Sequence, residues 1–411
     1  MRKYIYIIGV AITLLLASCS GDAYLNAIPQ GSTALISIDV AKSAEETGKT
    51  TSADVLKQLL RVTDVSDCGI DLSEKLYLFE APDGNLGLAA KVSDDDDLSD
   101  WLNKMSKEGV CKPVQKRRGK SFTVLKQSWV VAFSDEALLM MGPVVPSAQT
   151  ELMSQMVKYL DAEEGIKGTP MFDRLSEMSS AVAMVAQAQA LPEKFISLFT
   201  VGAPTDTDPS EVLIAAEMHA KDGCLLIDGK TFSFDENINK ALQTSSSVYR
   251  PLNGTFFNQI PEGSLFSLMM NVDGKKYLPM MKADKQLRGL LAGIGVKIDI
   301  DKFIEGVDGD LVFVVPRYSE ENMEMRWAAQ LSATAPELDT ESKDELAKCE
   351  LTATTTPLPA SLQTMLKGKR MCALFDLTSV EGDKKEVIAI ATTLLKPLFG
   401  DVKYVVYGSK E

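Results

Sequence analysis

The feature that most constrains the fold of this chain is a repeat that opens with Ile-Pro-x-Gly-Ser. The first copy begins at Ile28 (IPQGSTALISIDV) and the second at Ile260 (IPEGSLFSLMMNV). Each opening is followed, in the same order, by a helical stretch, an Ile-Asp pair (Ile70-Asp71, Ile298-Asp299) and a strand that ends at a proline (Pro82, Pro316). Several landmarks in one order indicate related structural units rather than a chance match. We therefore predict an internal duplication that gives two related halves.

Both copies predict the same succession of elements: a turn, a buried strand, a helix, two strands and a second helix. In the first copy the expected elements after the buried strand are a helix at Ala53–Val62, strands at Leu76–Phe79 and Leu86–Val92, and a helix at Asp94–Lys107. In the second copy they are a helix at Tyr277–Leu291, strands at Leu311–Val315 and Met323–Leu331, and a helix at Thr340–Lys348.

The rest of the chain interleaves short strands with helices. We expect strands at Val110–Arg117, Ser121–Leu125, Trp129–Phe133, Leu138–Met141, Val212–Ala220, Cys224–Phe234 and Val402–Tyr407. Expected helices lie near Leu152–Leu160, Met171–Met178, Glu193–Phe199 and Lys385–Phe399, with one more from Asp235 to about Leu242. Lys221-Asp222-Gly223 is the strongest hairpin turn. Because short turns join consecutive strands, the pattern predicts an α+β fold with mostly antiparallel sheets and packed helices.

The N-terminus predicts a lipoprotein signal peptide in residues 1–18. Arg2 and Lys3 are followed by an apolar run, Tyr4–Leu16, that is too short for a committed membrane span. Leu16-Ala17-Ser18-Cys19 matches a lipobox, so Cys19 is the expected lipidation site. The alternative is an uncleaved N-terminal anchor helix. The predicted domains are then the signal peptide at 1–18, an N-terminal half at 19–247 and a C-terminal half at 248–411, with the polar stretch Thr244–Ser247 as linker.

The amino-acid composition limits the cellular location and the binding partners that we expect for the protein. The 411 residues carry a net charge of −14 at pH 7, which becomes more negative once Arg2 and Lys3 are removed. An acidic surface repels nucleic acid and anionic head groups, so lipid on Cys19 must hold the protein to the membrane. The expected location is the cell envelope, at the outer membrane. Besides Cys19 there are Cys68, Cys111, Cys224, Cys349 and Cys372; these are expected as buried free thiols, with at least one disulfide as the alternative.

The lipobox, the opening YLNAIPQGSTALISIDV, the hairpin EMHAKDGCLLIDGKTFS and the returning IPEGSLFSLMMNVDG together resemble an uncharacterised domain family of Bacteroidetes envelope lipoproteins. The similarity runs from about Tyr24 to the C-terminus. The resemblance implies an exported, lipid-anchored envelope protein whose activity is unassigned. It carries over no catalytic residues.

Standard catalytic and cofactor motifs do not form. His219 is the only histidine, so any Ser-His or Cys-His pair would depend on it, and its position at a strand end favours a solvated residue. The Gly-Lys-Ser/Thr triplets at 48–50, 119–121 and 229–231 lack the preceding glycine of a phosphate loop. The acidic run Asp94–Asp97 lacks the spacing of a calcium loop and predicts a helix start capped by Ser93. No cofactor or metal is expected.

Two weaker signals leave the function open. Lys112, Lys116, Arg117, Arg118 and Lys120 surround Gly119 and predict a solvated hairpin tip, with docking of an anionic partner as the alternative. Trp101, Trp129 and Trp327 lie in apolar periodic segments, which predicts core positions rather than sugar stacking. We therefore expect a non-enzymatic, lipid-anchored binding or structural protein, with an envelope protein as a candidate partner. The alternatives are a hydrolase that uses carboxylates the sequence does not single out, and a filament subunit that donates its terminal strand.

Overall fold

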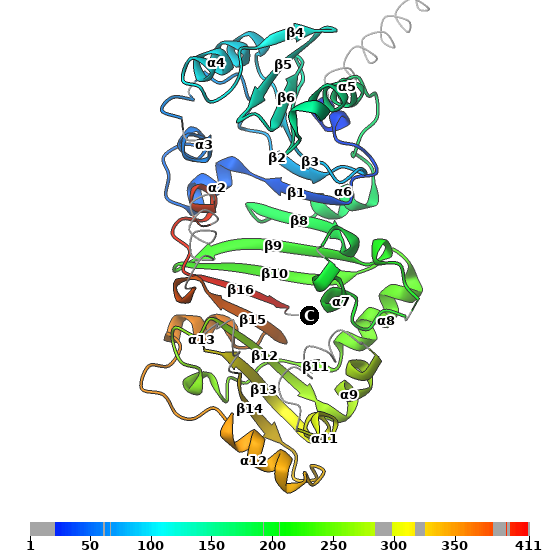
Figure 1. Ribbon diagram of the computed structural model, residues 1–411, viewed down its shortest axis with the longest axis vertical. Coiled ribbons are helices and arrows are strands. Elements are labelled where there is room, and N and C mark those ends of the chain that lie inside the picture. Colours follow the sequence, from blue (N-terminus) through cyan, green and yellow to red (C-terminus); the bar gives the residue numbers. More distant parts are fainter. Residues whose placement is uncertain are drawn as a thin grey trace, which may run out of the picture. The chain divides into compact units, whose positions relative to one another are not determined.

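The computed structural model describes residues 21–60, 62–65, 67–191, 193–204, 206–283, 298–316, 325–380, 392 and 395–409. The chain forms two compact units (Figure 1). Unit 1 comprises Met1–Val40 and Val62–Asp173, and unit 2 comprises Ala41–Arg61 and Arg174–Glu411. These bounds differ from the halves 19–247 and 248–411 because residues 41–61 and 174–247 belong to unit 2.

Unit 1 is built on a sheet in which every pair of neighbours is antiparallel. Its strands, in spatial order, are β1 (Ala34–Ile38), β2 (Leu76–Glu80), β3 (Leu86–Lys91), β7 (Ala137–Gly142), β6 (Trp129–Phe133), β5 (Lys120–Leu125) and β4 (Gln115–Arg117). The interior strand β6 is apolar at successive positions because both of its faces are covered. Helix α5 packs against β6 and β7 on one face.

The helices of unit 1 are the 3₁₀ helices η1 (Ala23–Ala27) and η2 (Pro146–Ala148) and the α-helices α4 (Asp95–Lys107), α5 (Gln149–Leu160) and α6 (Pro170–Ser176), the last of which contains the unit boundary. Three of these helices begin at an aspartate cap or a proline: α4 at Asp94, η2 at Pro146 and α6 at Pro170. Helix α4 buries Leu98, Trp101, Leu102 and Met105. The prediction of Ser93 as its cap is wrong by one residue, because the Asp94 side chain accepts the Asp96 and Asp97 N–H groups.

Unit 2 is built on a sheet with one parallel pair, β10 with β16, among antiparallel neighbours. Its spatial order is β14 (Arg326–Leu331), β13 (Val307–Val315), β12 (Phe266–Asp273), β15 (Met371–Asp376), β16 (Tyr404–Ser409), β10 (Cys224–Phe232), β9 (Leu213–Lys221) and β8 (Val182–Gln187), with β11 (Tyr249–Arg250) pairing to β12. The hairpin turn between β9 and β10 is confirmed, since Asp222 and Gly223 have φ of 52° and 75°.

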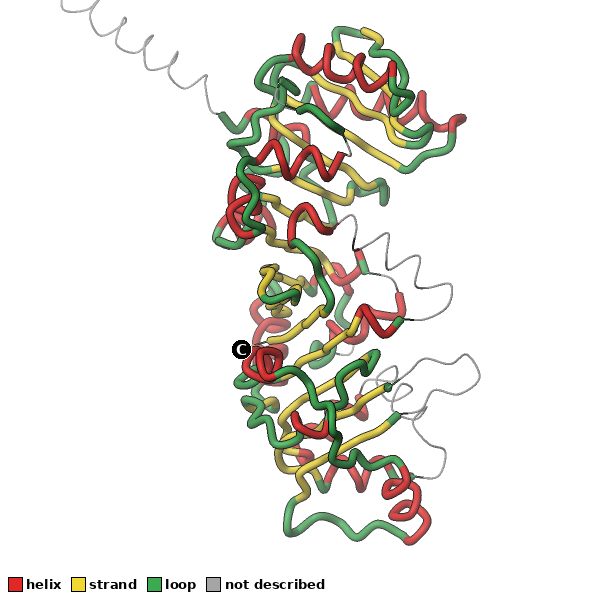
Figure 2. Tube along the Cα trace, turned by 90° about the vertical axis from the view of Figure 1, so that its left-hand side faces the viewer, coloured by secondary structure: helices red, strands yellow, loops and turns green. Residues whose placement is uncertain are grey.

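The helices of unit 2 are coloured red in Figure 2. They are α2 (Val40–Glu46), whose first residue belongs to unit 1, α3 (Ser52–Leu60), η3 (Ala188–Ala190), α7 (Glu193–Thr200), η4 (Pro209–Glu211), α8 (Glu236–Ser246), η5 (Phe257–Gln259), α9 (Gly274–Ala283), α11 (Ile300–Glu305), α12 (Thr340–Lys348), α13 (Ala360–Leu366) and η6 (Leu377–Ser379). The predicted cap Asp235 is confirmed, because its side chain accepts the Asn237 and Ile238 N–H groups. The α+β class with mostly antiparallel strands is therefore confirmed.

The two Ile-Pro-x-Gly-Ser segments have the same strand order and connectivity. The first runs β1, helices, β2, β3, α4 and pairs its strands in the order β1-β2-β3; the second runs β12, helices, β13, β14, α12 and pairs them in the order β12-β13-β14. Ile28 and Ile260 are both fully buried. In each turn the serine hydroxyl donates to the proline carbonyl, Ser32 to Pro29 at 2.7 Å and Ser264 to Pro261 at 2.8 Å.

Several predicted elements need correction. The expected linker Thr244–Ser247 is instead the end of α8 and its C-cap. Within Val110–Arg117 only Gln115–Arg117 is a strand. Strands β8 and β15 and helices α2 and α13 were not expected from the sequence. The predicted helices at Tyr277–Leu291 and Lys385–Phe399 and the strand start at Met323 lie partly outside the described residues.

Candidate functional site

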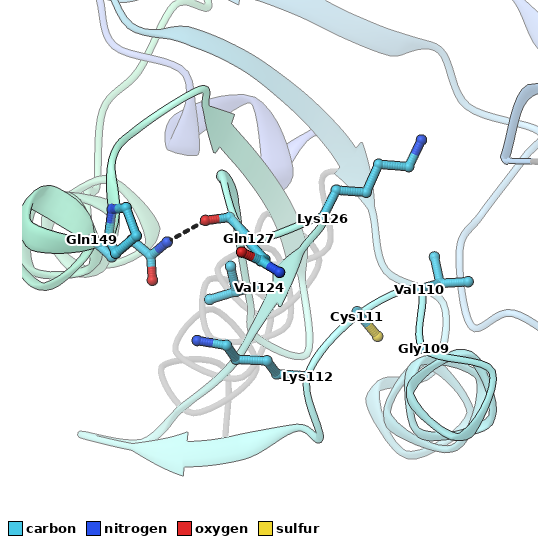
Figure 3. Close-up of a pocket in the computed structure, with 9 residues that line it drawn as sticks. Gly109, Val110, Cys111, Lys112, Val124, Lys126, Gln127 and Gln149 are labelled. Carbon is cyan, nitrogen blue, oxygen red and sulfur yellow. Dashed lines mark hydrogen bonds between the residues drawn. The ribbon is translucent and has the colours of Figure 1, made fainter.

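A cavity of about 470 Å³ opens in unit 1 between the end of α4, the β5–β6 turn and the start of α5. Figure 3 shows the side chains around it. Its lining residues are Gly109, Val110, Cys111, Lys112, Val124, Lys126, Gln127, Pro146 and Gln149. Cavities of this size commonly hold small ligands, with apolar walls and a few polar groups that fix orientation.

One wall forms where α4 stops and the chain turns toward the sheet edge. Gly109 has φ of 78°, a conformation that glycine adopts without a steric penalty and that ends the helix. Cys111 then bridges to Leu125, and the Lys112 N–H donates to the Val124 carbonyl at 3.0 Å. This ladder fixes the backbone of the wall and places Lys112 on its surface.

The opposite wall is a tight turn that two non-glycine residues make in left-handed conformation. Lys126 and Gln127 have φ of 43° and 64°. The turn is tied to the start of α5, because the Gln149 amide Nε2 donates to the Gln127 carbonyl at 2.7 Å (Figure 3). Gln149 is only 8% exposed. Left-handed backbone at such residues is uncommon, and strain of this kind often marks a functional position.

The electrostatics of the cavity favour a negatively charged ligand. Lys112 and Lys126 are exposed, and within the described part of the chain neither forms an ion pair. None of the nine lining residues is acidic. In Figure 3 Lys112 extends toward the side on which Gln149 lies, whereas Lys126 points away from it. Lys112 is therefore the cation best placed to meet an anionic group inside the cavity.

The thiol in the cavity is poorly suited to act as a nucleophile. Burial raises the pKa of Cys111 above its ordinary value, so the unreactive protonated form is favoured. Its sulfur donates to the Leu102 carbonyl at 3.2 Å, back into α4. The arrangement of thiol, ammonium and amide groups can bind and orient a ligand, but it offers no activated attacking group.

The other cysteines are also free. Cys68, Cys224 and Cys372 are buried like Cys111, and Cys349 is partly buried. Burial raises the pKa of Cys224 and of Cys372 to about 12. The expectation of free thiols is confirmed for these five residues. Cys19 lies outside the described residues.

The other sequence motifs lie on separate elements and none of them lines the cavity as a motif. The Gly-Lys-Ser/Thr triplets fall in the α2–α3 connection, in the β4–β5 turn and inside β10. The acidic run Asp94–Asp97 caps and opens α4. Trp101 and Trp327 are buried and Trp129 is partly buried. In the described residues no group of three His, Cys, Asp or Glu side chains could hold a metal ion, and no helix is long and apolar enough to cross a membrane.

His219 lies on β9, partly buried, opposite Leu226 of β10. We expect His219→Ala to leave any hydrolase activity of the purified protein unchanged within a few-fold, because His219 belongs to unit 2 and does not line the cavity of unit 1. Loss of a general base typically lowers a rate by about 10² to 10⁴, so a catalytic role could not escape detection. Parallel rate measurements on wild type and variant check this; a collapse in rate with intact folding would contradict it.

The sequence pointed to only one of the polar side chains in the cavity. Lys112 belonged to the predicted basic cluster, whereas Lys126, Gln127 and Gln149 carried no signal, because only tertiary packing brings them together. The rest of the cluster lies at the β4–β5 tip as expected: Lys116, Arg117 and Arg118 are exposed, and Lys120 pairs with Asp161 at 2.9 Å.

Comparison with known proteins identifies a family but no activity. Residues 27–335 match the family described as "Domain of unknown function (DUF4836)". No curated protein matches the chain. Three solved structures, crystal forms IV, I and III of TP0453, match with TM-scores of 0.33, 0.33 and 0.34 at 12%, 12% and 14% identity. The matches cover 51%, 56% and 55% of this chain and 83%, 84% and 86% of TP0453.

Proposed function

This chain belongs to the DUF4836 family, and we propose that it is a lipid-anchored protein of the cell envelope that binds a ligand without transforming it. The observation that carries the proposal is the cavity of unit 1, which joins an unpaired ammonium group and two amides to apolar walls. The proposed location is the outer membrane of a Bacteroidetes cell, with the lipid on Cys19 as the anchor after removal of residues 1–18.

The small number of residues between Cys19 and the first buried side chains supports anchoring at Cys19. Tyr24 and Leu25 of η1 are 3% and 4% exposed, and the Tyr24 hydroxyl donates to the Lys75 carbonyl at 3.0 Å. Lys167 pairs with Asp22 at 2.7 Å. The signal and lipobox therefore lie directly before a packed domain, as they would in a protein held close to its membrane.

The ligand that suits the cavity has an anionic group and an apolar part. Lys112 would pair with the anion, while the Gln127 and Gln149 amides provide further hydrogen bonds. Val110, Val124 and Pro146 form an apolar wall, and Val145, which is 64% exposed, extends it outward. An alkyl phosphate has this combination of an anionic group and an apolar part.

The two other functions have less support. A carboxylate-dependent hydrolase would need its acids elsewhere, because the cavity lining contains none. A filament subunit would need to release its terminal strand, but β16 pairs with β10 on one side and β15 on the other, and Val406 is fully buried.

The binding proposal is tested with hexyl phosphate, hexanol and inorganic phosphate titrated into the unlipidated chain from residue 20 onward. We expect hexyl phosphate to bind more tightly than the other two. Lys112→Gln should weaken that binding about tenfold, since a hydrogen bond to a charged group contributes about 1.5–3 kcal/mol. The matched control is Lys240→Gln, at an exposed lysine of α8 in unit 2, which should bind as wild type does. Equal affinities for wild type and Lys112→Gln would refute the site.

We also infer that the two Ile-Pro-x-Gly-Ser segments arose by internal duplication. The support is the shared strand order, the shared connectivity and the equivalent serine-to-proline hydrogen bonds in their turns. The strands β1, β2 and β3 of the first segment belong to unit 1, and the strands β12, β13 and β14 of the second belong to unit 2.

A further inference from the structure

We propose that the tip of the β4–β5 hairpin, formed by Lys116, Arg117 and Arg118, rests on the phosphate head groups of the membrane in which the lipid of Cys19 is inserted. The proposal rests on the proposed anchoring at Cys19. It assigns a membrane-facing end to unit 1 and a role to a basic cluster on an otherwise acidic protein.

The N-terminal residues of the described chain lie near one end of the unit 1 sheet. Gly21 lies against Lys91 and Glu74, since a Cβ there would be 3.4 Å from the Lys91 Nζ and 3.6 Å from a Glu74 oxygen. Cys19 is two residues earlier, and two extended residues span at most about 7 Å. The acyl chains must therefore enter the bilayer close to the end of the sheet where Lys91 lies.

The strand register places the tip of the β4–β5 hairpin at the end of the sheet where Lys91 lies. Lys91 at the end of β3 is opposite Ala137 on β7, and the β6–β7 turn beyond Phe133 and Leu138 lies at that end too. Ser121, which follows Lys120 at the start of β5, is opposite Phe133. Three strand spacings separate β3 from β5, roughly 14–15 Å.

The segment 161–167 provides independent evidence that the hairpin tip lies near the N-terminal residues of unit 1. Lys120 pairs with Asp161 at the C-terminus of α5, at 2.9 Å. From there the chain returns along η1: the Ile166 N–H donates to the Leu25 carbonyl at 3.4 Å, and Lys167 pairs with Asp22. The six residues from Asp161 to Lys167 span at most about 20 Å. Both routes place the tip within reach of the membrane surface.

The charges at this end single out the tip as the cationic contact. Lys91 pairs with Asp71 and Glu74, and Lys167 and Lys120 also have carboxylate partners. Lys116, Arg117 and Arg118 are exposed, and the described residues offer them no ion pair. Asp94–Asp97 at the start of α4, which follows β3, and Asp135 and Glu136 in the β6–β7 turn also lie at this end, so attraction to phosphate is confined to the hairpin corner. The cavity of unit 1 lies at the other end of β5, at Val124 and Lys126, and remains open to ligand.

Three cations suffice only because the lipid already holds the protein at the surface. A tether converts a weak attraction into an intramolecular one with high effective concentration. Each lysine or arginine near an anionic surface shifts the docked-to-free ratio by about fivefold. Charges on a short edge strand can instead protect the protein against aggregation. That role requires no membrane, and it predicts self-association of a variant that lacks the charges.

The test uses the lipidated full-length mature protein in vesicles of phosphatidylethanolamine with phosphatidylglycerol. A fluorophore is placed at Gln115→Cys, on the exposed β4, and quenched by a lipid that carries a spin label at its head group. The matched control is Val145→Cys, at the other end of the sheet, where Gly142 of β7 pairs with Leu86. We expect strong quenching at position 115 and little at 145. High salt and vesicles of phosphatidylcholine alone should both reduce the quenching at 115.

The triple variant Lys116→Gln, Arg117→Gln, Arg118→Gln should lower the docked-to-free ratio by about a hundredfold at unchanged vesicle flotation. Equal quenching at 115 and 145 in wild type, with flotation intact, would overturn the docking proposal. Failure of the wild type to float would instead overturn the anchoring on which it rests. A variant that self-associates while wild-type quenching shows no dependence on lipid charge would assign the cations to edge protection and also overturn the proposal.

Discussion

Asp310→Ala is expected to destabilise unit 2 by about 3 to 5 kcal/mol, because this buried carboxylate holds the backbone of the loop at 253–255. Asp310 lies on β13 and is 1% exposed. Its two oxygens accept the backbone N–H groups of Asn253, Gly254 and Thr255 at 3.0, 2.8 and 2.9 Å, and the Asn271 side-chain amide at 2.9 Å. Alanine would leave these donors without an acceptor. Each buried unsatisfied donor costs about 1–3 kcal/mol.

Denaturant unfolding followed by a probe in unit 2 measures this effect. The matched control is Asp308→Ala, two residues earlier on the same strand. Asp308 pairs with Arg250 at 2.9 Å, but the two side chains are 54% and 43% exposed, so the pair should contribute no more than about 1 kcal/mol. Similar unfolding midpoints for the two variants would show that the Asp310 network does not stabilise the unit.

Cys19→Ala is expected to abolish membrane attachment entirely. We propose Cys19 as the lipid-bearing residue because it closes the lipobox Leu16-Ala17-Ser18-Cys19, and no described helix could replace the anchor. The net charge of −14 adds electrostatic repulsion from anionic lipid over most of the surface. Without acyl chains, the three cations of the hairpin tip would give only weak, salt-sensitive binding.

Metabolic labelling with a fatty-acid analogue, followed by membrane fractionation, checks this expectation. Ser20→Ala serves as the control, since it changes the neighbouring residue and keeps the thiol. The control should be labelled and should remain with the membranes. Equal labelling of Cys19→Ala and wild type would show that lipid is attached elsewhere or that the chain is held by another means.

Local sequence signals predicted much of the fold. The β6 strand Trp129–Phe133 and the helix α12 at Thr340–Lys348 form as predicted, because apolar runs and acidic caps act over a few residues. The β9–β10 hairpin followed from Asp222-Gly223, whose left-handed conformation the turn requires. The repeat predicted matching connectivity around β1 and β12, since the same turn and strand pattern recurs in both.

What the sequence did not reveal depends on contacts between distant segments. The alanine-rich Val182–Gln187 shows little β preference, yet it forms β8 because β9 pairs with it. Asp310 carries no local mark of the loop at 253–255 that it binds. Lys126 and Gln127 adopt left-handed backbone in the turn between β5 and β6, where a sequence reading expects glycine or asparagine. The cavity was therefore beyond prediction, although the basic tip beside β5 was not.

The most direct test of membrane anchoring is the mass of the mature N-terminal peptide isolated from native envelopes. We expect a peptide that begins at Cys19, lacks residues 1–18 and carries the added mass of acyl chains on its sulfur. Such a peptide would place the lipid two residues before Gly21, the first residue that the structure describes. A peptide that retains residues 1–18, or that begins at Cys19 without added lipid, would contradict the anchoring.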